Sequence, residues 1–370
     1  MQSDSNAHIH GGSVELLRLL DVANVIDLDV AEKLAARRGA SRGETQVRGP
    51  DKVPGGVVLG SNPLDLPLDD LLLAGFEFAV HARLFDFGVV SLRFSMKLAD
   101  GMTTEEMIDL SDKLEQLTLL DAKAREVWNE LASDLRESLR EEHSVELFED
   151  YTIFHVRGVR GVTDAKEALA LLQPAELLLA EAMSPLASSV KDAHQSRAIQ
   201  YYAFDAAVIG WSAALVIDPH GHRDELEVLE LATARRLELR YYDQLLSREL
   251  AAVYRAAGDA RKASSLFRSP FVHVARRAGT LFIEITDLYD RLEGALTLVG
   301  DAYTSRLYRE AAERFRLGDL SSAVKEKLGT LSRVSEIFEA EIGHRRTTVL
   351  EVSVVALIFL ELILGLVRAH

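Results

Sequence analysis

The sequence contains no cysteine among its 370 residues. Disulfide bonds, a thiol nucleophile and cysteine-ligated zinc or iron–sulfur sites are therefore excluded. Basic residues are also few, since 42 Lys and Arg stand against 58 Asp and Glu, which gives a net charge of −16. A field of this sign repels nucleic acid, so general nucleic-acid binding is not expected. The sequence also lacks a phosphate loop, a Gly-x-Ser-x-Gly elbow and a His-Glu-x-x-His zinc motif.

What is present is the composition of a folded protein, with 48% hydrophobic and 27% charged residues. The chain is long enough for roughly two to three domains. Its pattern predicts an α+β protein: an N-terminal α+β region with two similar β-hairpins, then a helical bundle, then a single C-terminal transmembrane helix. The predicted segments are a helix and loop segment at 1–70, an α+β domain at 71–223, a bundle at 224–346 and a transmembrane helix at 347–367.

Two stretches read as strand, turn and strand, at 77–98 and 196–219, because β-branched and aromatic residues flank a central turn. Phe85-Asp86 in the first matches Phe204-Asp205 in the second. This match indicates either two related α+β halves or two similar hairpins in one sheet. By contrast, the spacing of Leu and Val over 13–38 predicts a helix.

From Asp224 onward the pattern is helical, and Gly-Asp pairs mark the expected breaks between helices. The breaks fall at Gly258-Asp259, Gly300-Asp301 and Gly318-Asp319. Leu positions repeat at amphipathic spacing through the first of these helices. The sequence therefore predicts a bundle suited to contacts between subunits.

The C-terminal segment from Thr347 to Val367 has 21 residues without Lys, Arg, Asn, Gln or Pro. As a helix it would be about 30 Å long, the thickness of a hydrocarbon core. Arg345 and Arg346 precede it, and this basic flank predicts a tail anchor with the body on the cytoplasmic side.

Two acids interrupt this apolar segment, Glu351 and Glu361. They are ten residues apart and fall on similar sides of a helix, which favours contacts within an oligomer. The alternative is a soluble oligomeric protein whose last helix completes its own core.

The segment "DPHGHRDE" contains the strongest candidate for a metal site. Asp218, His220, His222 and Asp224 are of the residue types that bind metal ions. A Pro-Gly turn of this kind is also polar simply because it is solvated and because Asp caps the next helix. Both interpretations stay open, and the metal site would make the protein a membrane-associated, metal-dependent hydrolase.

A cluster of cationic and aromatic residues lies within the first long helix. It can be a partner or anion patch, or a solvated and salt-bridged helix face. Its members are Arg235, Arg236, Arg240, Tyr241 and Tyr242.

Several short stretches resemble the required-for-meiotic-nuclear-division family. They are Leu350-Glu351-Val352 with Glu361 ten residues after the first acid, "FGVVSLRF" at 87–94, "RLLDVANVIDLD" at 18–29 and "LEVLELATARRLELRYYDQLL" at 226–246. The resemblance implies a membrane-bound homo-oligomer linked to translation, and it supplies no catalytic residues. The composition and the lack of a transit peptide suggest a bacterial relative, in which the membrane would be the cytoplasmic one.

Together these features predict a tail-anchored, non-enzymatic scaffold or tether. It would self-associate and present its α+β domain to a cytoplasmic protein or ribonucleoprotein partner. No cofactor is identified.

Overall fold

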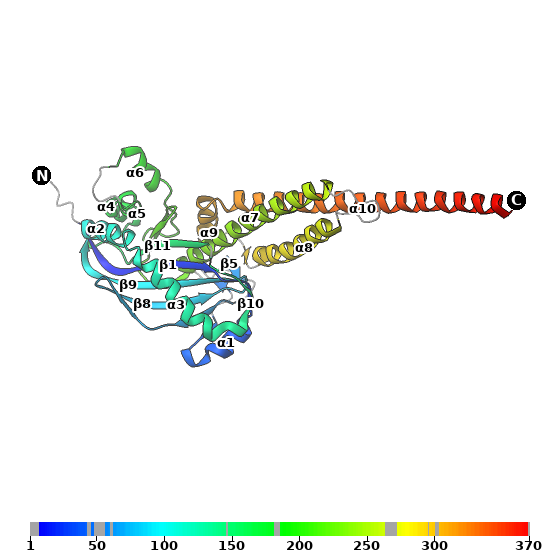
Figure 1. Cartoon of the computed structure of the whole chain (residues 1–370). Coiled ribbons are helices and arrows are strands. Elements are labelled where there is room, and N and C mark those ends of the chain that lie inside the picture. Colours follow the sequence, from blue (N-terminus) through cyan, green and yellow to red (C-terminus); the bar gives the residue numbers. More distant parts are fainter. Residues whose placement is uncertain are drawn as a thin grey trace. The chain divides into compact units, whose positions relative to one another are not determined.

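The computed structural model describes residues 7–42, 46–47, 56–59, 62–145, 147–180, 186–262, 272–294, 296–299 and 303–368 (Figure 1). The chain divides into two compact units. Unit 1 comprises Met1–Leu239 with Arg291–Gly318, and unit 2 comprises Arg240–Asp290 with Asp319–His370.

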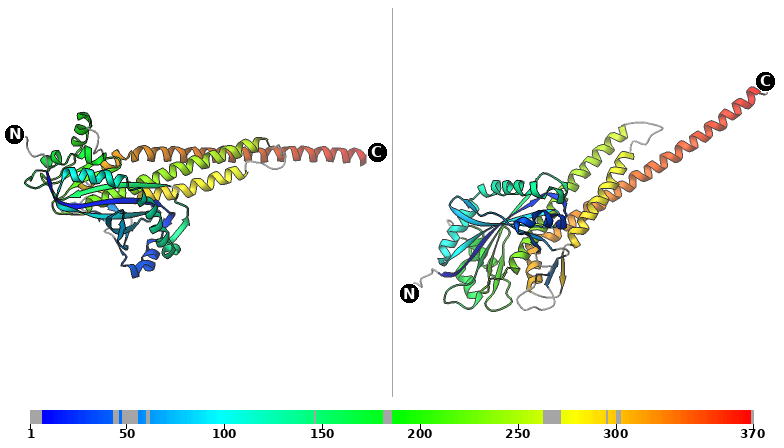
Figure 2. Two further views of the ribbon diagram at one scale, coloured as in Figure 1. Left: turned by 60° about the vertical axis from the view of Figure 1, so that its left-hand side comes forward. Right: turned by 90° about the horizontal axis from the view of Figure 1, so that it is seen from below.

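Unit 1 is organised around a nine-stranded sheet (Figure 2). The strand order is β12-β13-β11-β1-β9-β8-β6-β3, and β7 pairs with β8. Its strands are β1 (His8–Asp21), β3 (Ser41–Arg42), β6 (Leu64–Pro67), β7 (Leu71–Leu73), β8 (Phe76–Leu84), β9 (Val89–Thr103), β11 (Phe148–Val156), β12 (Ala206–Ile209) and β13 (Ala213–Ile217). Every pairing is antiparallel except that of β11 with β13. A connection that contains helices joins this parallel pair, as parallel pairing requires.

The predicted helix over 13–38 is wrong, because its first half is the central strand β1. Leu16, Leu17, Leu19 and Leu20 are all buried, so both faces of β1 are covered. A strand covered on both faces shows no alternation of apolar and polar residues, and its sequence imitates a buried helix. Only α1 (Leu28–Ala35) is helical in this stretch, after β2 (Ala23–Ile26).

Helices complete the core of unit 1. They are α2 (Thr104–Glu115), α3 (Leu119–Leu135), α4 (Ala165–Leu172), α5 (Pro174–Leu178), α6 (Ser188–Gln195) and α9 (Tyr303–Arg314), with short 3-10 turns η1 (Ala36–Arg38) and η2 (Arg136–Ser138). Thr103 caps the start of α2: its hydroxyl accepts from the backbone N–H of Glu106, and the Glu106 carboxylate accepts from the backbone N–H of Thr103. Met107 and Trp128 then pack into the same core as Phe94.

The first predicted hairpin is confirmed as β8–β9, and the stretch 196–219 contains the hairpin β12–β13. The turn of the second hairpin lies between Ile209 and Ala213, and Phe204-Asp205 precedes β12 rather than forming the turn. The two hairpins lie in one sheet rather than in two separate halves, on opposite sides of the central strand β1. Two smaller sheets are formed as well, one by β10 (Leu139–Glu142) with β2, the other by β4 (Gln46–Val47), β5 (Gly56–Leu59) and β14 (Leu296–Val299). The strand β14 falls where the sequence predicted helix.

Unit 2 contains most of α7 (Asp224–Lys262), α8 (Val272–Gly294) and α10 (Leu317–Arg368). Lys327 Nζ on α10 donates to Asp243 Oδ1 on α7 at 2.6 Å. Buried Leu246, Ile285 and Leu331 come from the three helices in turn. The predicted helical bundle is therefore present in this unit. The predicted break at Gly300-Asp301 lies outside the described residues, and the one at Gly258-Asp259 is wrong, because α7 continues through it. The break predicted at Gly318-Asp319 occurs slightly earlier, since α9 ends at Arg314 and α10 begins at Leu317, with Arg316 at a left-handed φ of +55°.

The predicted transmembrane helix, and with it the tail anchor and the membrane location, is wrong. In the described residues, no helix combines the length and the apolar character that a membrane crossing needs. The mixed α+β part of the predicted fold is retained.

Candidate functional site

The β12–β13 hairpin ends at a cluster of carboxylates and imidazoles. Ala206 of β12 lies opposite Ile217 of β13. Asp205 precedes β12 and Asp218 follows β13, so antiparallel pairing places both acids at the same end of the hairpin.

The turn after β13 is built around the carboxylate of Asp218, which is 4% exposed. The backbone N–H of His220 donates to its Oδ1 at 2.9 Å, and the backbone N–H of His222 donates to its Oδ2. Gly221 takes a left-handed φ of +70°, and its N–H donates to the carbonyl of Asp218 at 3.2 Å. The sequence Asp-Pro-His-Gly-His folds this way because Asp closes such turns and Gly tolerates positive φ.

This turn brings three potential metal ligands together. Asp218, His220 and His222 each offer one ligand atom, and the three atoms lie within 4.8 Å of one another. Ligands around a zinc ion, each about 2.0–2.2 Å from the metal, are separated by roughly 3–3.5 Å. The side chains of His220 and His222 are 58% and 46% exposed, so their rings have room to turn toward a common ion.

Asp218 also orients one of the imidazoles. Nδ1 of His222 lies 3.1 Å from Oδ2 of Asp218. The contact keeps this ring nitrogen of His222 beside a carboxylate oxygen of Asp218, and in its unprotonated form the nitrogen can share a metal ion with that carboxylate.

Asp224, the fourth predicted ligand, is the first residue of α7 and does not belong to this group of three. Its neighbour Glu225 is buried, at 4% exposed, and its Oε2 has no hydrogen-bond partner. Burial raises the pKa of Glu225 to about 8, and the nearby charges of Asp218, Asp224 and Asp205 also act to raise it. The site therefore includes a carboxyl group that favours its protonated form near neutral pH.

Asp205 holds the loop that precedes β12. Its Oδ1 accepts from the backbone N–H groups of Tyr201, at 2.8 Å, and Tyr202, at 3.0 Å. Burial raises the pKa of Asp205, the two N–H donors lower it, and Asp218 raises it further. Sequence reasoning missed both Asp205 and Glu225. The position of Asp205 just before β12 was the available signal, since Asp218 stands just after β13.

Two members of the predicted cationic patch, Arg235 and Arg236, form hydrogen bonds within the fold. Arg235 donates to Glu293 at 2.8 Å and to the hydroxyl of Tyr308 at 2.9 Å, and Arg236 donates to the carboxylate of Glu149. Both guanidinium groups are buried. These N–H groups therefore donate to acceptors inside unit 1.

The remaining members of that patch lie in unit 2. Arg240 and Tyr241 are half-buried, and Tyr242 is buried with its ring 5.7 Å from that of Tyr241. A partner at this helix face stays a prediction.

The predicted oligomer contacts lie on α10. Glu351 and Glu361 are exposed there. Arg345 and Arg346 belong to the same helix, but their side chains lie outside those the structure describes.

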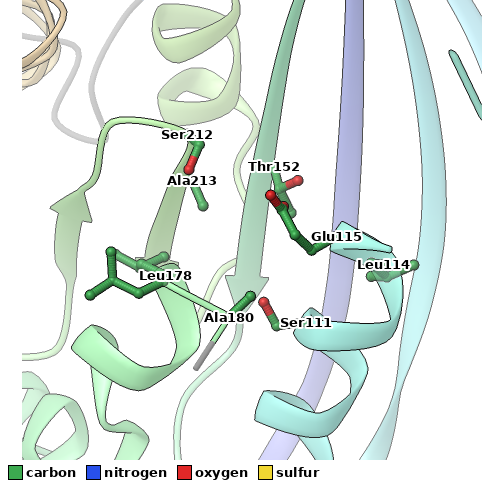
Figure 3. A pocket seen from close by; sticks show the side chains of 9 residues that line it. Ser111, Leu114, Glu115, Thr152, Leu178, Ala180, Ser212 and Ala213 are labelled. Carbon is green, nitrogen blue, oxygen red and sulfur yellow. The ribbon is translucent and has the colours of Figure 1, made fainter. Parts of the chain in front are cut away.

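A small cavity lies between α2, the strand β11, the end of α5 and the start of β13 (Figure 3). Its volume is about 30 Å³, enough for little more than one water molecule. The hydroxyl of Ser111 lies at its edge and donates to the carbonyl of Leu177 at 2.8 Å. This cavity is too small for a substrate.

A wider hollow of about 320 Å³ lies beside α4, α5 and α6. Glu176 and Lys191 line it and form an ion pair with each other. It lacks the grouped ligands of the β13–α7 turn, which is therefore the best candidate site in the described part of the chain.

The large mixed sheet and the turn at its edge define an α+β domain. This chain belongs to the family described as "Uncharacterized protein MJ0711, N-terminal domain", whose model matches residues 11–224. The match covers most of unit 1 and includes all four predicted metal ligands.

One relative is the "Uncharacterized protein MJ0711" of the archaeon Methanocaldococcus jannaschii, 26% identical over 174 residues. These residues make up 46% of this chain and 52% of the relative, so the match spans about half of each protein. No solved structure matches the chain.

The predicted membership of the required-for-meiotic-nuclear-division family is therefore wrong, and nothing supports a bacterial origin. The stretches that carried the resemblance explain the error. The segment 87–94 lies mostly in the buried strand β9, and 18–29 spans the end of β1 and all of β2. Short aliphatic runs of this kind occur in buried strands of many folds.

Proposed function

We propose that unit 1 binds a divalent transition-metal ion through Asp218, His220 and His222. The observation that carries this proposal is the placement of their three ligand atoms within 4.8 Å of one another. Two imidazoles and one carboxylate suit zinc, iron or a similar ion. Three protein ligands leave coordination positions for water or substrate, as in catalytic sites.

The reaction class that such a site favours is metal-assisted hydrolysis. A bound metal lowers the pKa of its water and supplies hydroxide near neutral pH. Glu225 adds a buried carboxyl group close to the site. The membrane-anchored scaffold is not retained, and this proposal takes up the hydrolase alternative without a membrane.

The test is calorimetric titration of the metal-free full chain with zinc chloride, followed by metal analysis after dialysis. One zinc per chain is expected, and the His220→Ala/His222→Ala variant should retain less than a tenth of it. His194→Ala is the control, because His194 lies on α6 and its Nδ1 contacts the carbonyl of Val190. Equal zinc binding by the double variant and the parent chain would contradict the proposal.

We also infer that the chain self-associates through α10. Leu350 and Leu357 are 65% and 64% exposed, and large apolar side chains that gather on one surface mark interaction sites. Sedimentation velocity of the full chain should show an oligomer that the Leu350→Glu/Leu357→Glu variant weakens. Thr348→Glu is the matched control, since Thr348 is an exposed polar position on the same helix. A monomeric parent chain would contradict this inference.

A further inference from the structure

A row of aromatic rings leads to the proposed metal ligands. Tyr202 and Phe204 stack with centroids 5.0 Å apart and planes 12° apart. The ring of Phe204 lies 5.5 Å from that of His220, which in turn lies 5.3 Å from that of His222. The rings and the metal ligands therefore form one continuous surface.

The loop that carries these rings is held in place by backbone hydrogen bonds. Besides the two bonds to Asp205, the carbonyl of Ala203 accepts from the N–H of Ala165 at 2.7 Å, at the start of α4. Ile199 and Ala207 exchange two further bonds at 2.9 Å. A site whose shape is fixed before binding loses less entropy when a ligand arrives.

Two aromatic side chains of this loop are not used to fill the core. Tyr201 is 39% exposed and Phe204 is 36% exposed, although the adjoining strands β12 and β13 are buried throughout. Exposed aromatic rings beside convergent polar groups are characteristic of ligand sites. Stacking on such rings favours the binding of a nucleobase, because every base has a flat π-face.

We propose that this surface binds a mononucleotide, with its base stacked on the Tyr202–Phe204 rings and its phosphate on the metal ion. The inference rests on the proposed metal site and names the substrate class for it. The rings of Phe204 and His220 are in contact, with centroids 5.5 Å apart, so a base on Phe204 and a phosphate on the metal ion lie within the length of one nucleotide.

Charge selects the small ligand over a nucleic acid strand. The carboxylates of Asp205, Asp218 and Asp224 are close to the site, so a phosphate approaches only where the metal ion offsets their negative field. A polynucleotide would place further phosphates against a chain of net charge −16.

The test uses the full chain loaded with zinc, titrated separately with AMP, adenosine and ribose 5-phosphate. AMP should bind at least about tenfold more tightly than either fragment, because only AMP uses both the rings and the metal. The Phe204→Leu variant should lose about tenfold in AMP affinity while its zinc affinity and its affinity for ribose 5-phosphate stay unchanged. Tyr254→Leu is the control, since Tyr254 is an exposed aromatic residue on α7.

Two outcomes overturn the inference. If zinc binds but AMP binds no better than ribose 5-phosphate, the base is not recognised, and the proposed metal function still stands. If zinc does not bind at all, both the metal site and the nucleotide site are wrong. Titration with zinc alone separates these two results.

Discussion

Asp218 contacts His222 at two points. Its Oδ2 accepts from the backbone N–H of His222 and lies 3.1 Å from the ring Nδ1 of the same residue. One buried carboxylate thus closes the turn and sets the direction of a metal-binding imidazole. The two roles can be separated by mutation, because the turn needs an acceptor while the metal needs a charge.

Replacement of Asp218 by Asn should weaken zinc binding by at least about tenfold. The amide keeps one acceptor oxygen for the turn but loses the negative charge, and it loses the second acceptor as well. The free energy of unfolding should fall by about 1–2 kcal/mol, from the hydrogen bond that is no longer made. Calorimetry with zinc and denaturant unfolding measure the two effects.

Asp224→Asn is the control for the effect of Asp218→Asn on zinc affinity. Asp224 is outside the group of three ligands, so its replacement should change zinc affinity by less than about twofold. Similar losses in the Asp218 and Asp224 variants would mean that the ligand set predicted from sequence, with four members, is the right one.

The pH dependence of stability should reflect the buried carboxyl of Glu225. Its pKa is about 8 in the folded chain, against an ordinary value of 4.5. Between these values the folded chain retains a proton that the unfolded chain has lost, so the free energy of unfolding falls as pH rises from about 4.5 to about 8. The total loss is on the order of 3–5 kcal/mol for metal-free protein.

Denaturant unfolding at pH 5, 6, 7 and 8 in the presence of a chelator measures this slope. Glu225→Gln should flatten it, since the amide stays neutral throughout. Glu167→Gln, at an exposed position of α4, should keep the slope of the parent chain. If the Glu225 variant showed the parental slope, another group would be responsible.

Local patterns in the sequence are enough to predict some of these features. The hairpin β8–β9 is recognisable because its two strands are close in sequence and joined by a tight turn. The turn around Asp218 is recognisable for the same reason, since all three ligands fall within five positions. Both are local structures whose residues determine their own geometry.

Other features depend on contacts that the sequence does not reveal. The strand β1 pairs with β9 and β11, which lie far along the chain, and it is buried on both faces, so its own pattern imitates a helix. Asp205 joins the site only through the register of β12 against β13. Arg236 looks like a surface cation until its buried partner Glu149 on β11 is known.

The turn between β8 and β9 requires glycine at position 88. Gly88 has φ of +95°, and a Cβ atom there would lie 1.7 Å from the carbonyl oxygen of Ala23. Gly88→Ala should therefore lower the free energy of unfolding by about 3 kcal/mol or more, because backbone rather than a flexible side chain must move. Denaturant unfolding measures the loss.

Gly75→Ala is the matched control for this clash. Gly75 has a similar φ of +86°, but no atom lies within 4 Å of the position that its Cβ would take. The substitution should cost only the conformational strain, about 1 kcal/mol. Equal losses at the two glycines would show that the close approach of Ala23 does not contribute.

Arg236 and Glu149 form a buried ion pair, so their contributions to the free energy of unfolding should be strongly coupled. Arg236 also donates to the carbonyl of Trp211 at 2.9 Å, and its guanidinium lies 4.7 Å from the ring centre of Phe315. Arg236→Met should cost about 3–5 kcal/mol, because it leaves the carboxylate of Glu149 buried without this partner. The Arg236→Met/Glu149→Met double variant should lose less than the sum of the two single losses.

The summed losses of unfolding free energy in the two single variants should exceed the loss in the double variant by about 1–3 kcal/mol, the range for groups in direct contact. Arg197→Met is the control, since Arg197 is exposed and its replacement should stay within about 0.5 kcal/mol of the parent chain. Additive losses would show that the two groups do not interact. If Arg236→Met lowered the free energy of unfolding only slightly, Arg236 would instead be an exposed residue, as its sequence context suggests.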